Sequence, residues 1–534
     1  MQSESLPGWA QEGKKLIGMW AGALLVLLLV SLIGRPDIPI DETRYIGVAW
    51  ESWLHGDWLV LHANGQPYHH KPPLLFWLIG AGWSLFGVND WWPRAISTLS
   101  SLACAVLVFR IAERLWPAQR EVATRAGWLL LSGVLWLVFS TALMFDVLLT
   151  ACTLLALLCV LDAASAGGKR PWLVCGLAIG FGVLCKGPFI LLIVVPVCFA
   201  GPWWGGAGAR GKSWWLGVFG ALALGGAMAL FWVVPAALAG GEEFRNAILW
   251  RQIAGRVSGE LAHRQPIWFY LAVMPVLAFP LFFVARGWQG AVVKLRNLSD
   301  PGVRFILAWI VPAFLLLSLS GGKQIHYVLP LWPALALLAA FAWRDSGKGL
   351  LFVPMIIGAI GLALVAYPWW VEGKWFAYLA NREWQFAGAL LVILALALFG
   401  VTRRKPTATA PALAGASMFM LGILMLSVVK AFSPAFDMTP MANRLKQLEL
   451  EGRAVVHVSA YNDQYHFYGR LSRNLEQVGR EEIGNWFAQN PDGMAVIYTK
   501  TYAEAKRLPA DFIQPYLSGG VALIDRQALA VWRP

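Results

Sequence analysis

The chain is dominated by apolar runs that are long enough to cross a lipid bilayer. A membrane-spanning helix needs about 20 predominantly apolar residues. Thirteen stretches approach or reach that length: 16–34, 92–113, 126–144, 147–164, 172–185, 187–202, 214–238, 267–286, 304–320, 328–343, 349–368, 385–402 and 412–430. Charged residues make up only 14% of the chain, too few to cover a water-soluble particle of this size. We therefore expect an α-helical polytopic membrane protein with about 13 transmembrane helices.

The basic residues predict the orientation of these helices. If the amino terminus is placed inside and the helices alternate, every inner end carries Lys or Arg, from Lys14 and Lys15 to Arg403 and Arg404. This is the pattern of the positive-inside rule. It accounts for most of the net charge of +13, so no nucleic-acid partner is expected. The six cysteines all lie in apolar stretches and indicate neither disulfides nor a zinc site.

The polar segments predict the domain organisation. Residues 1–430 form the expected transmembrane region, with outer loops at 35–91 and 239–266. Within the first loop, 43–55 can form an amphipathic helix, and 71–87 reads as a re-entrant or interfacial helix. Residues 431–534 read as a small extracytoplasmic α/β domain, with helices at 441–450 and 481–489 and strands at 453–459, 494–500 and 521–525.

Paired carboxylates begin the first outer loop. Asp41 and Glu42 lie just beyond the first predicted span. Such a pair can orient an acceptor, take up a proton or bind a divalent metal. It can also do no more than favour the start of a helix.

Cations and histidines follow in the outer segments. Lys71 lies between His69-His70 and two prolines, where it can hold a phosphate or extend to the interface from a helix start. The adjacent histidines and His263 are candidate metal ligands. Lys186 and Lys323 lie at further outer turns.

Asp146 separates two apolar runs. An acid at membrane depth is costly and marks a functional site, although a turn in the headgroup zone would also accommodate it. Together with the outer cations it predicts a lipid-phosphate substrate, whose tail lies among the helices and whose headgroup meets the loops.

A series of motifs along residues 35–335 adds to this prediction. They are Asp41-Glu42-Thr43-Arg44-Tyr45, Gly56-Asp57-Trp58, Asn64-Gly65-Gln66-Pro67-Tyr68, Lys71-Pro72-Pro73-Leu74, His263-Arg264-x-Pro266 and Gly322-Lys323-x-x-x-Tyr327-x-Leu329-Pro330. In order and spacing the chain resembles bacterial polyprenyl-phosphate-sugar-dependent glycosyltransferases of the GT-C class, in particular the ArnT-like lipid A aminoarabinose transferases. The resemblance implies a GT-C fold in the inner membrane, with the active site and the C-terminal domain on the periplasmic side.

The resemblance also implies roles for single residues. Asp41 matches the first catalytic acid of the family, with Glu42 beside it, and Asp146 matches the second. The residues assigned to the lipid-phosphate donor are Arg44, Tyr68, Lys71, Lys186, Lys323 and Tyr327. His263 matches a histidine that can bind a divalent metal (zinc, magnesium or manganese). His70 stands where the family has an acid; it could still ligate zinc, but it adds no negative charge for an amino sugar.

The expected function is transfer of a sugar from a polyprenyl-phosphate donor to lipid A, lipopolysaccharide or another envelope acceptor, within membrane lipids. Three alternatives stay open: a transporter or flippase of a lipid-linked saccharide, a protein O-mannosyltransferase and an O-antigen ligase. A transporter should carry its ionisable residues near the midplane of the bilayer, often in two related halves. Here these residues cluster towards one face.

Overall fold

The computed structural model describes residues 8–248, 264–284, 298–343, 351–367 and 382–532. The chain divides into two compact units. Unit 1 comprises Met1–Ser31, His70–Leu75 and Arg94–Ser427, and unit 2 comprises Leu32–His69, Phe76–Pro93 and Val428–Pro534. Segments of the first outer loop and the C-terminal residues therefore share a unit.

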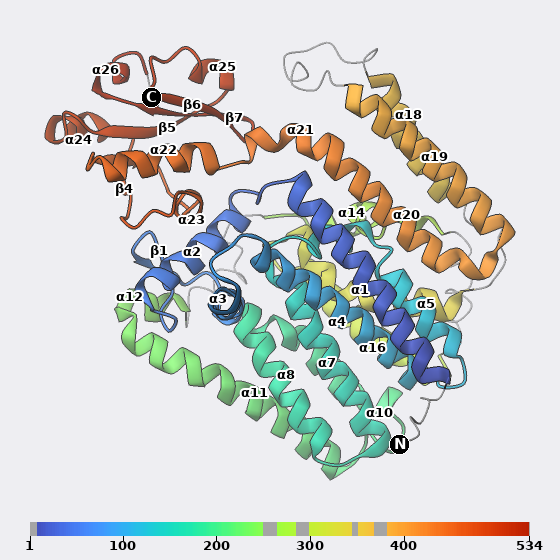
Figure 1. Ribbon diagram of the computed structural model, residues 1–534. Helices are drawn as coiled ribbons and strands as arrows, with labels where there is room; N and C mark the ends of the chain where they lie inside the picture. The colour runs from blue at the N-terminus through green and yellow to red at the C-terminus, as the bar shows by residue number, and fades with distance from the viewer. Residues whose placement is uncertain (1–7, 249–263, 285–297, 344–350, 368–381, 533–534) are drawn as a thin grey trace, which may run out of the picture. The chain divides into compact units, whose positions relative to one another are not determined.

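Unit 1 is built from helices (Figure 1). Their bounds are α1 (Gly8–Gly34), α4 (Trp91–Leu115), α5 (Arg120–Leu130), α6 (Val134–Phe139), α7 (Phe145–Ala166), α8 (Arg170–Lys186), α9 (Leu191–Phe199), α10 (Gly201–Trp204), α11 (Lys212–Ala239), α12 (Gly241–Asn246), α14 (Phe269–Leu277), α16 (Pro301–Leu319), α17 (Trp332–Ala342), α18 (Phe352–Ala366), α19 (Arg382–Arg404) and α20 (Thr409–Leu424). Short 3₁₀ helices join some of them: η1 (Gly187–Ile190), η3 (Leu281–Phe283) and η4 (Ile325–Leu331). Helix α8 packs between α7 and α11, and α19 packs between α18 and α20.

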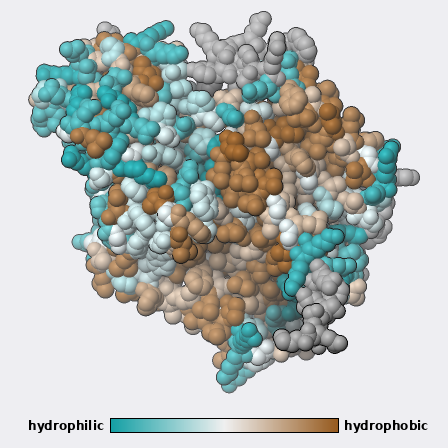
Figure 2. Space-filling view, in the orientation of Figure 1, coloured by the Kyte–Doolittle hydropathy of each residue, from teal (hydrophilic) through white to brown (hydrophobic). Residues whose placement is uncertain are grey.

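These helices have the length and the surface of membrane spans. Within the described part of the chain, nine helical runs are long and apolar enough to cross a bilayer. Large apolar side chains stay exposed on them, such as Phe231 at 86% and Leu238 at 75% on α11. Figure 2 shows a largely brown, hydrophobic surface over the helices of unit 1. Lipid is the environment that suits such a surface, and the predicted polytopic membrane protein is confirmed.

Helices α8 and α9 form a hairpin, in agreement with two separate predicted stretches, 172–185 and 187–202. The Trp172 ring, at the start of α8, lies 5.0 Å from that of Trp214, and the Trp204 ring, beyond α9, lies 6.0 Å from the same Trp214. A straight helix over these residues would place Trp172 and Trp204 about 48 Å apart. The chain therefore turns back at Gly187, which has a φ of +69°, and Lys186 lies at this turn.

The predicted span 126–144 is interrupted between α5 and α6. Gly133 lies in the break, where a Cβ atom would come within 2.4 Å of the Trp332 ring. The indole nitrogen of Trp332 donates to the carbonyl of Leu130 at 2.8 Å. The Leu130 carbonyl also accepts from the Gly133 N–H at 3.4 Å, whereas the Val134 N–H, its partner in a continuous α-helix, donates to the Phe279 carbonyl.

Unit 2 holds a five-stranded sheet. Its elements are α2 (Asp41–His55), β1 (His62–Ala63), β2 (Gln66–Pro67), α3 (Leu74–Phe86), α21 (Lys430–Phe432), α22 (Thr439–Leu450), β3 (Val455–Val458), α23 (His466–Gly469), β4 (Glu476–Val478), α24 (Ile483–Gln489), β5 (Met494–Thr499), α25 (Tyr502–Ala505), β6 (Phe512–Tyr516), β7 (Gly519–Ile524) and α26 (Arg526–Leu529). The strand order is β4-β3-β5-β7-β6. Strand β3 is parallel to β4 and β5, whereas β7 is antiparallel to β5 and β6.

Both faces of this sheet are covered. Along β5, Met494 and Val496 belong to one apolar cluster, with residues of α22. Ala495 and Ile497 belong to the other, with residues of α24. This alternation follows from the two-residue period of a strand. The predicted α/β domain at the C-terminus is confirmed.

The first outer segment is attached to the C-terminal residues within unit 2. The Asn64 side chain donates to the carbonyl of Leu475 at 2.8 Å and accepts from its N–H at 2.7 Å. The indole nitrogen of Trp50 donates to the carbonyl of Leu471 at 3.0 Å. Asn64 has a φ of +50° and Gly65 of +75°, the backbone that a tight turn between β1 and β2 requires. Helix α2 is thereby held by residues more than 400 positions later in the chain.

Candidate active site

A buried ion pair forms the centre of the candidate site in unit 1. Asp146 lies in the first turn of α7, and Lys186 is the last residue of α8. The Lys186 ammonium donates to the Asp146 carboxylate, and both side chains are 2% exposed. The amino-terminal end of α7 also favours a carboxylate electrostatically. Because desolvating two charges is costly, such a pair persists only when its contacts are well made.

Helix η4 brings aromatic groups onto this pair. The Nε2 atom of His326 lies 4.0 Å from an Asp146 oxygen. The Lys186 nitrogen lies 4.6 Å from the centre of the Tyr327 ring and 5.4 Å from that of Phe189. A cation is attracted to such ring faces, and more strongly where water is excluded. Lys186 is therefore fixed by a carboxylate and by two rings.

Lys71 belongs to the same unit. Its nitrogen lies 5.8 Å from the centre of the Phe145 ring, and Phe145 directly precedes Asp146. The structure therefore brings together four residues that were predicted as site residues from separate segments of the sequence: Lys71, Asp146, Lys186 and Tyr327. His326 was not selected from the sequence, although it lies beside Tyr327 within the last motif.

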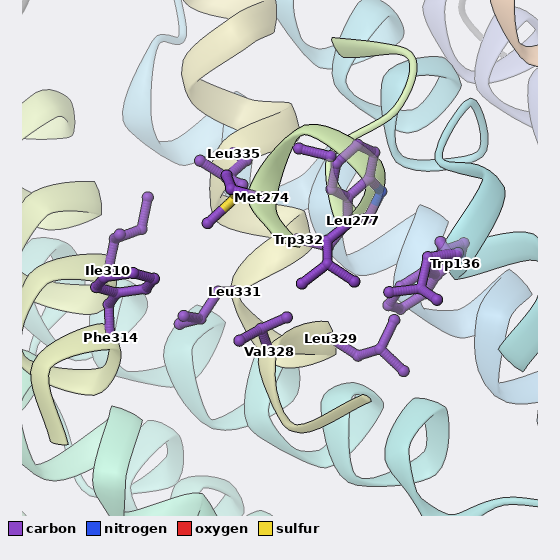
Figure 3. Close-up of a pocket in the computed structure, with 12 residues that line it drawn as sticks. Trp136, Met274, Leu277, Ile310, Phe314, Val328, Leu329, Leu331, Trp332 and Leu335 are labelled. Atoms are coloured by element: carbon purple, nitrogen blue, oxygen red, sulfur yellow. The ribbon is translucent and has the colours of Figure 1, made fainter. Parts of the chain in front are cut away.

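An apolar pocket lies further along η4 (Figure 3). Val328 and Leu329, the residues that follow Tyr327, line it. Leu331 of η4 also lines it, and the other walls come from α6, α14 with the residue that follows it, α16 and α17: Leu135, Trp136, Met274, Leu277, Ala278, Ile310, Phe314, Trp332 and Leu335. The indole nitrogen of Trp136 donates to Ser101 and that of Trp332 to Leu130. The pocket therefore suits a hydrocarbon chain.

A second group of predicted residues lies in unit 2, on and near α2. Asp41 accepts from the Arg44 guanidinium at 2.5 Å and from the Tyr45 hydroxyl at 3.3 Å. Its side chain is 43% exposed, so a substrate can reach the carboxylate. Burial alone would lower the pKa of Arg44, but Tyr68, Tyr45 and Asp41 outweigh burial and raise it. Burial also raises the pKa of the Tyr68 hydroxyl, and Tyr68 stays neutral beside this cation.

Glu42 has a different environment from Asp41. It is buried, and its two oxygens accept from the Arg35 guanidinium at 2.5 and 3.1 Å. One of these oxygens also accepts from the Ile38 N–H at 2.7 Å. These contacts hold residues 35–42 at the start of α2. Glu42 is placed to support Asp41, its neighbour in the chain, and its role as a catalytic acid stays a prediction.

The remaining predicted residues are Lys323 and the two histidines. The Lys323 ammonium donates to the carbonyls of Gln265 at 2.9 Å and Ser320 at 2.5 Å. His70 is exposed, and His263 lies outside the described residues. Across the described residues, no group of three or more His, Cys, Asp or Glu side chains is placed to hold a metal ion.

Comparison with known proteins identifies the family of the chain. A family model described as dolichyl-phosphate-mannose-protein mannosyltransferase matches residues 70–238. The undecaprenyl phosphate-alpha-4-amino-4-deoxy-L-arabinose arabinosyl transferase of Edwardsiella ictaluri is 32% identical over 384 residues, which cover 67% of each chain. The corresponding transferase 2 of Pseudomonas fluorescens is 33% identical over 354 residues, which cover 61% of this chain and 60% of that protein.

A solved structure shows the same fold. ArnT from Cupriavidus metallidurans, in its complex with undecaprenyl phosphate, aligns with a TM-score of 0.74 at 21% identity, covering 97% of this chain and 98% of that one. The apo form of the same protein also gives a TM-score of 0.74. The predicted GT-C fold is confirmed. With the sequence match to the Edwardsiella protein, it shows that the chain belongs to the ArnT-like family of membrane glycosyltransferases.

Proposed function

We propose that the protein transfers 4-amino-4-deoxy-L-arabinose, or a closely related sugar, from undecaprenyl phosphate to lipid A or another lipopolysaccharide acceptor. The reaction takes place at the periplasmic face of the bacterial inner membrane. The observation that carries the proposal is the buried Asp146–Lys186 pair, with Tyr327 and Lys71 close by. The relatives named above supply the sugar and the carrier lipid.

The donor needs a cationic place for its phosphate and an apolar place for its tail. Helix η4 contributes to both, because Tyr327 contacts Lys186 while Val328 and Leu329 line the apolar pocket. Lys71 and Lys186 supply two ammonium groups near one carboxylate, Asp146. This cluster attracts an anionic group, and we assign it to the donor phosphate.

The reaction replaces one glycosidic bond by another. An oxygen of the acceptor bonds to the anomeric carbon while the bond from that carbon to the phosphate oxygen breaks, which inverts the anomeric centre. Undecaprenyl phosphate leaves with the bonding electrons. Fixed cations such as Lys71 and Lys186 stabilise this developing charge, and a single preorganised donor of this kind typically contributes about 3–4 kcal/mol.

Asp41 serves the acceptor in this scheme. If the acceptor is a hydroxyl group, the Asp41 carboxylate takes up its proton; if it is an ionised phosphate, Asp41 orients it. The partial exposure of Asp41 and its bonds from Arg44 and Tyr45 support this role. His70 and His263 stay proposed ligands of a divalent metal. The described residues, which do not include His263, hold no group of three or more His, Cys, Asp or Glu side chains placed for a metal ion.

The proposal is tested with the purified full chain in lipid nanodiscs. It is given undecaprenyl phosphate aminoarabinose or a polyprenyl phosphate mannose, with lipid A or a Ser/Thr peptide as acceptor, and the products are identified by mass spectrometry. Transfer of aminoarabinose to lipid A supports the proposal. Transfer of mannose to the peptide alone would instead favour the activity named by the family model. Movement of the donor across a vesicle membrane without transfer would identify a flippase. A parallel reaction with a chelator tests the metal.

A further inference from the structure

Lys323 lies inside a contact between two outer segments of unit 1. Its ammonium donates to the carbonyl of Gln265 at 2.9 Å, in a segment 58 positions earlier, and to that of Ser320 at 2.5 Å, in its own turn. Lys323 is only 4% exposed. Two of the three ammonium hydrogens are therefore used on backbone carbonyls, in a place that water hardly reaches.

Other bonds join the same two segments. Arg264 and Gly322 pair as an isolated antiparallel bridge. The N–H of Gln265 donates to the carbonyl of Gly321 at 3.4 Å. The Tyr270 hydroxyl donates to the carbonyl of Gln324 at 3.0 Å. These are bonds between neutral groups, and Lys323 adds the one charge-assisted contact among those named here.

Helix η4 starts directly after this contact. The N–H of Tyr327 donates to the carbonyl of Gln324 at 3.1 Å, so the first turn of η4 is built on the fastened segment. That turn carries His326 to Asp146 and the Tyr327 ring to Lys186. A shift of residues 320–324 would therefore move both side chains away from the buried ion pair.

We propose that Lys323 is a positioning residue that fastens 320–324 to 264–266 and thereby sets His326 and Tyr327 against the Asp146–Lys186 pair. This inference rests on the proposed function and reassigns Lys323 from the donor phosphate to the protein backbone. A phosphate that bound Lys323 would have to displace the carbonyls of Gln265 and Ser320. Those carbonyls would then lose a charge-assisted donor, which costs free energy.

The proposal is tested by a disulfide that joins the same two segments in place of the Lys323 hydrogen bonds. Bridged antiparallel residues lie about 4.5–5.5 Å apart at Cα, within the range for a disulfide. Arg264→Cys and Gly322→Cys are therefore combined with Lys323→Met, which removes the charge but keeps the chain length. We expect the reduced protein to lose kcat on the order of 10²-fold, with the donor KM within about twofold. Oxidation of the same sample should restore most of the kcat of the Cys pair that retains Lys323.

Two kinetic results would overturn the proposal. One is a donor KM at least tenfold higher that oxidation leaves unchanged, because Lys323 would then bind the phosphate. The other is a kcat that is the same in the reduced proteins with and without Lys323→Met. The Cys pair with Lys323 intact, reduced and oxidised, gives the baseline for both comparisons.

A binding measurement keeps the test independent of the cysteines. Undecaprenyl phosphate alone is titrated against the wild type, Lys323→Met and Lys71→Met, and the rise in melting temperature is recorded. We expect Lys323→Met to keep the wild-type response and Lys71→Met to lose most of it. A response lost in Lys323→Met but kept in Lys71→Met contradicts the positioning role. No response in the wild type would show that the proposed function itself is wrong, and the positioning role would then fall with it.

Discussion

Lys186 donates to Asp146 at a point where both side chains are 2% exposed. The two residues lie 40 positions apart, on the facing ends of α8 and α7. Tyr327 and Phe189 cover the ammonium group. An ion pair so enclosed is sensitive to the loss of either partner and is close to neutral in stability when both are replaced together. Comparing a single variant with the double variant therefore separates the contribution of the ion pair to stability from its contribution to catalysis.

The first prediction follows from that difference. Asp146→Asn leaves Lys186 buried without its carboxylate, so we expect transfer to be abolished and stability to fall by about 3–5 kcal/mol. The double variant Asp146→Asn with Lys186→Met should recover most of the melting temperature but none of the activity. Thermal unfolding and product mass spectrometry check both parts. Wild-type turnover in Asp146→Asn would contradict a catalytic role and would show that Asp146 is only a turn residue in the headgroup zone.

The second prediction concerns Asp41. Its side chain is 43% exposed and pairs with Arg44 within one turn of α2. Such pairs contribute about 0.2–1 kcal/mol, so Asp41→Asn should abolish transfer with little change in melting temperature. Turnover near the wild-type value would show that Asp41 only favours the start of α2.

Glu42→Gln provides the matched comparison, one residue further along. The change removes the carboxylate charge that the buried Arg35 guanidinium contacts through two hydrogen bonds. We expect a loss of stability of about 3–5 kcal/mol. Thermal unfolding of the two variants side by side measures the contrast. A stable but inactive Glu42→Gln protein would instead make Glu42 a catalytic acid.

The third prediction concerns Lys71. If its ammonium meets the leaving phosphate, the contact strengthens as that group gains charge, so the loss falls on kcat more than on KM. We expect Lys71→Ala to lower kcat on the order of 10²-fold. Lys71→Arg should recover only part of it, because a planar guanidinium is no substitute for a compact ammonium. Donor titration checks this; an unchanged kcat with a raised KM would show that Lys71 only anchors the donor.

The fourth prediction concerns the pH dependence of unit 2. Burial lowers the pKa of His457 to about 4, and its Nε2 lies 3.0 Å from the Tyr498 hydroxyl. The pKa of His466 is lowered to about 4 in the same way. At these two side chains, the unfolded state therefore binds more protons than the folded state between pH ~6.5 and about 4. Their contribution to stability should fall as the pH falls through this range, by up to about 1.4 kcal/mol per pH unit for each histidine.

Hydrogen exchange checks this locally. Amides of β3 and β5 in the full chain should lose protection between pH 6.5 and 4, after correction for the intrinsic exchange rate. His457→Gln should flatten the profile, and the double change with His466→Gln should flatten it further. If amide protection falls equally steeply with pH in the wild type and in both variants, these two histidines are not the cause of the pH dependence.

Much of the fold is visible in the sequence because its signals are local. The thickness of the bilayer sets the length of an apolar run, so the α8–α9 hairpin could be predicted as two stretches on either side of Lys186. Helix α2 follows from the amphipathic pattern of its own residues. Strands β4 and β6 were missed: β4 has three residues, and β6 contains Pro515 at the edge of the sheet. Short edge strands give a weak pattern.

The site was predicted less completely, because its partners are distant in the chain. Nothing in the sequence shows that Lys186 meets Asp146, or that Lys323 meets the carbonyl of Gln265. Arg35 looks like a flank of the first span, yet it is the partner that binds Glu42. The type and position of a residue can be read from the sequence, whereas its hydrogen-bond and ion-pair partners depend on the fold.

The most direct test of the account measures both products of one reaction. The purified wild-type chain is mixed with undecaprenyl phosphate aminoarabinose and lipid A, and free undecaprenyl phosphate and modified lipid A are quantified together by mass spectrometry. The account predicts that they form in equal amounts, and that neither forms in the double variant Asp146→Asn with Lys186→Met. Release of undecaprenyl phosphate without modified lipid A, or equal activity in the double variant, would contradict it.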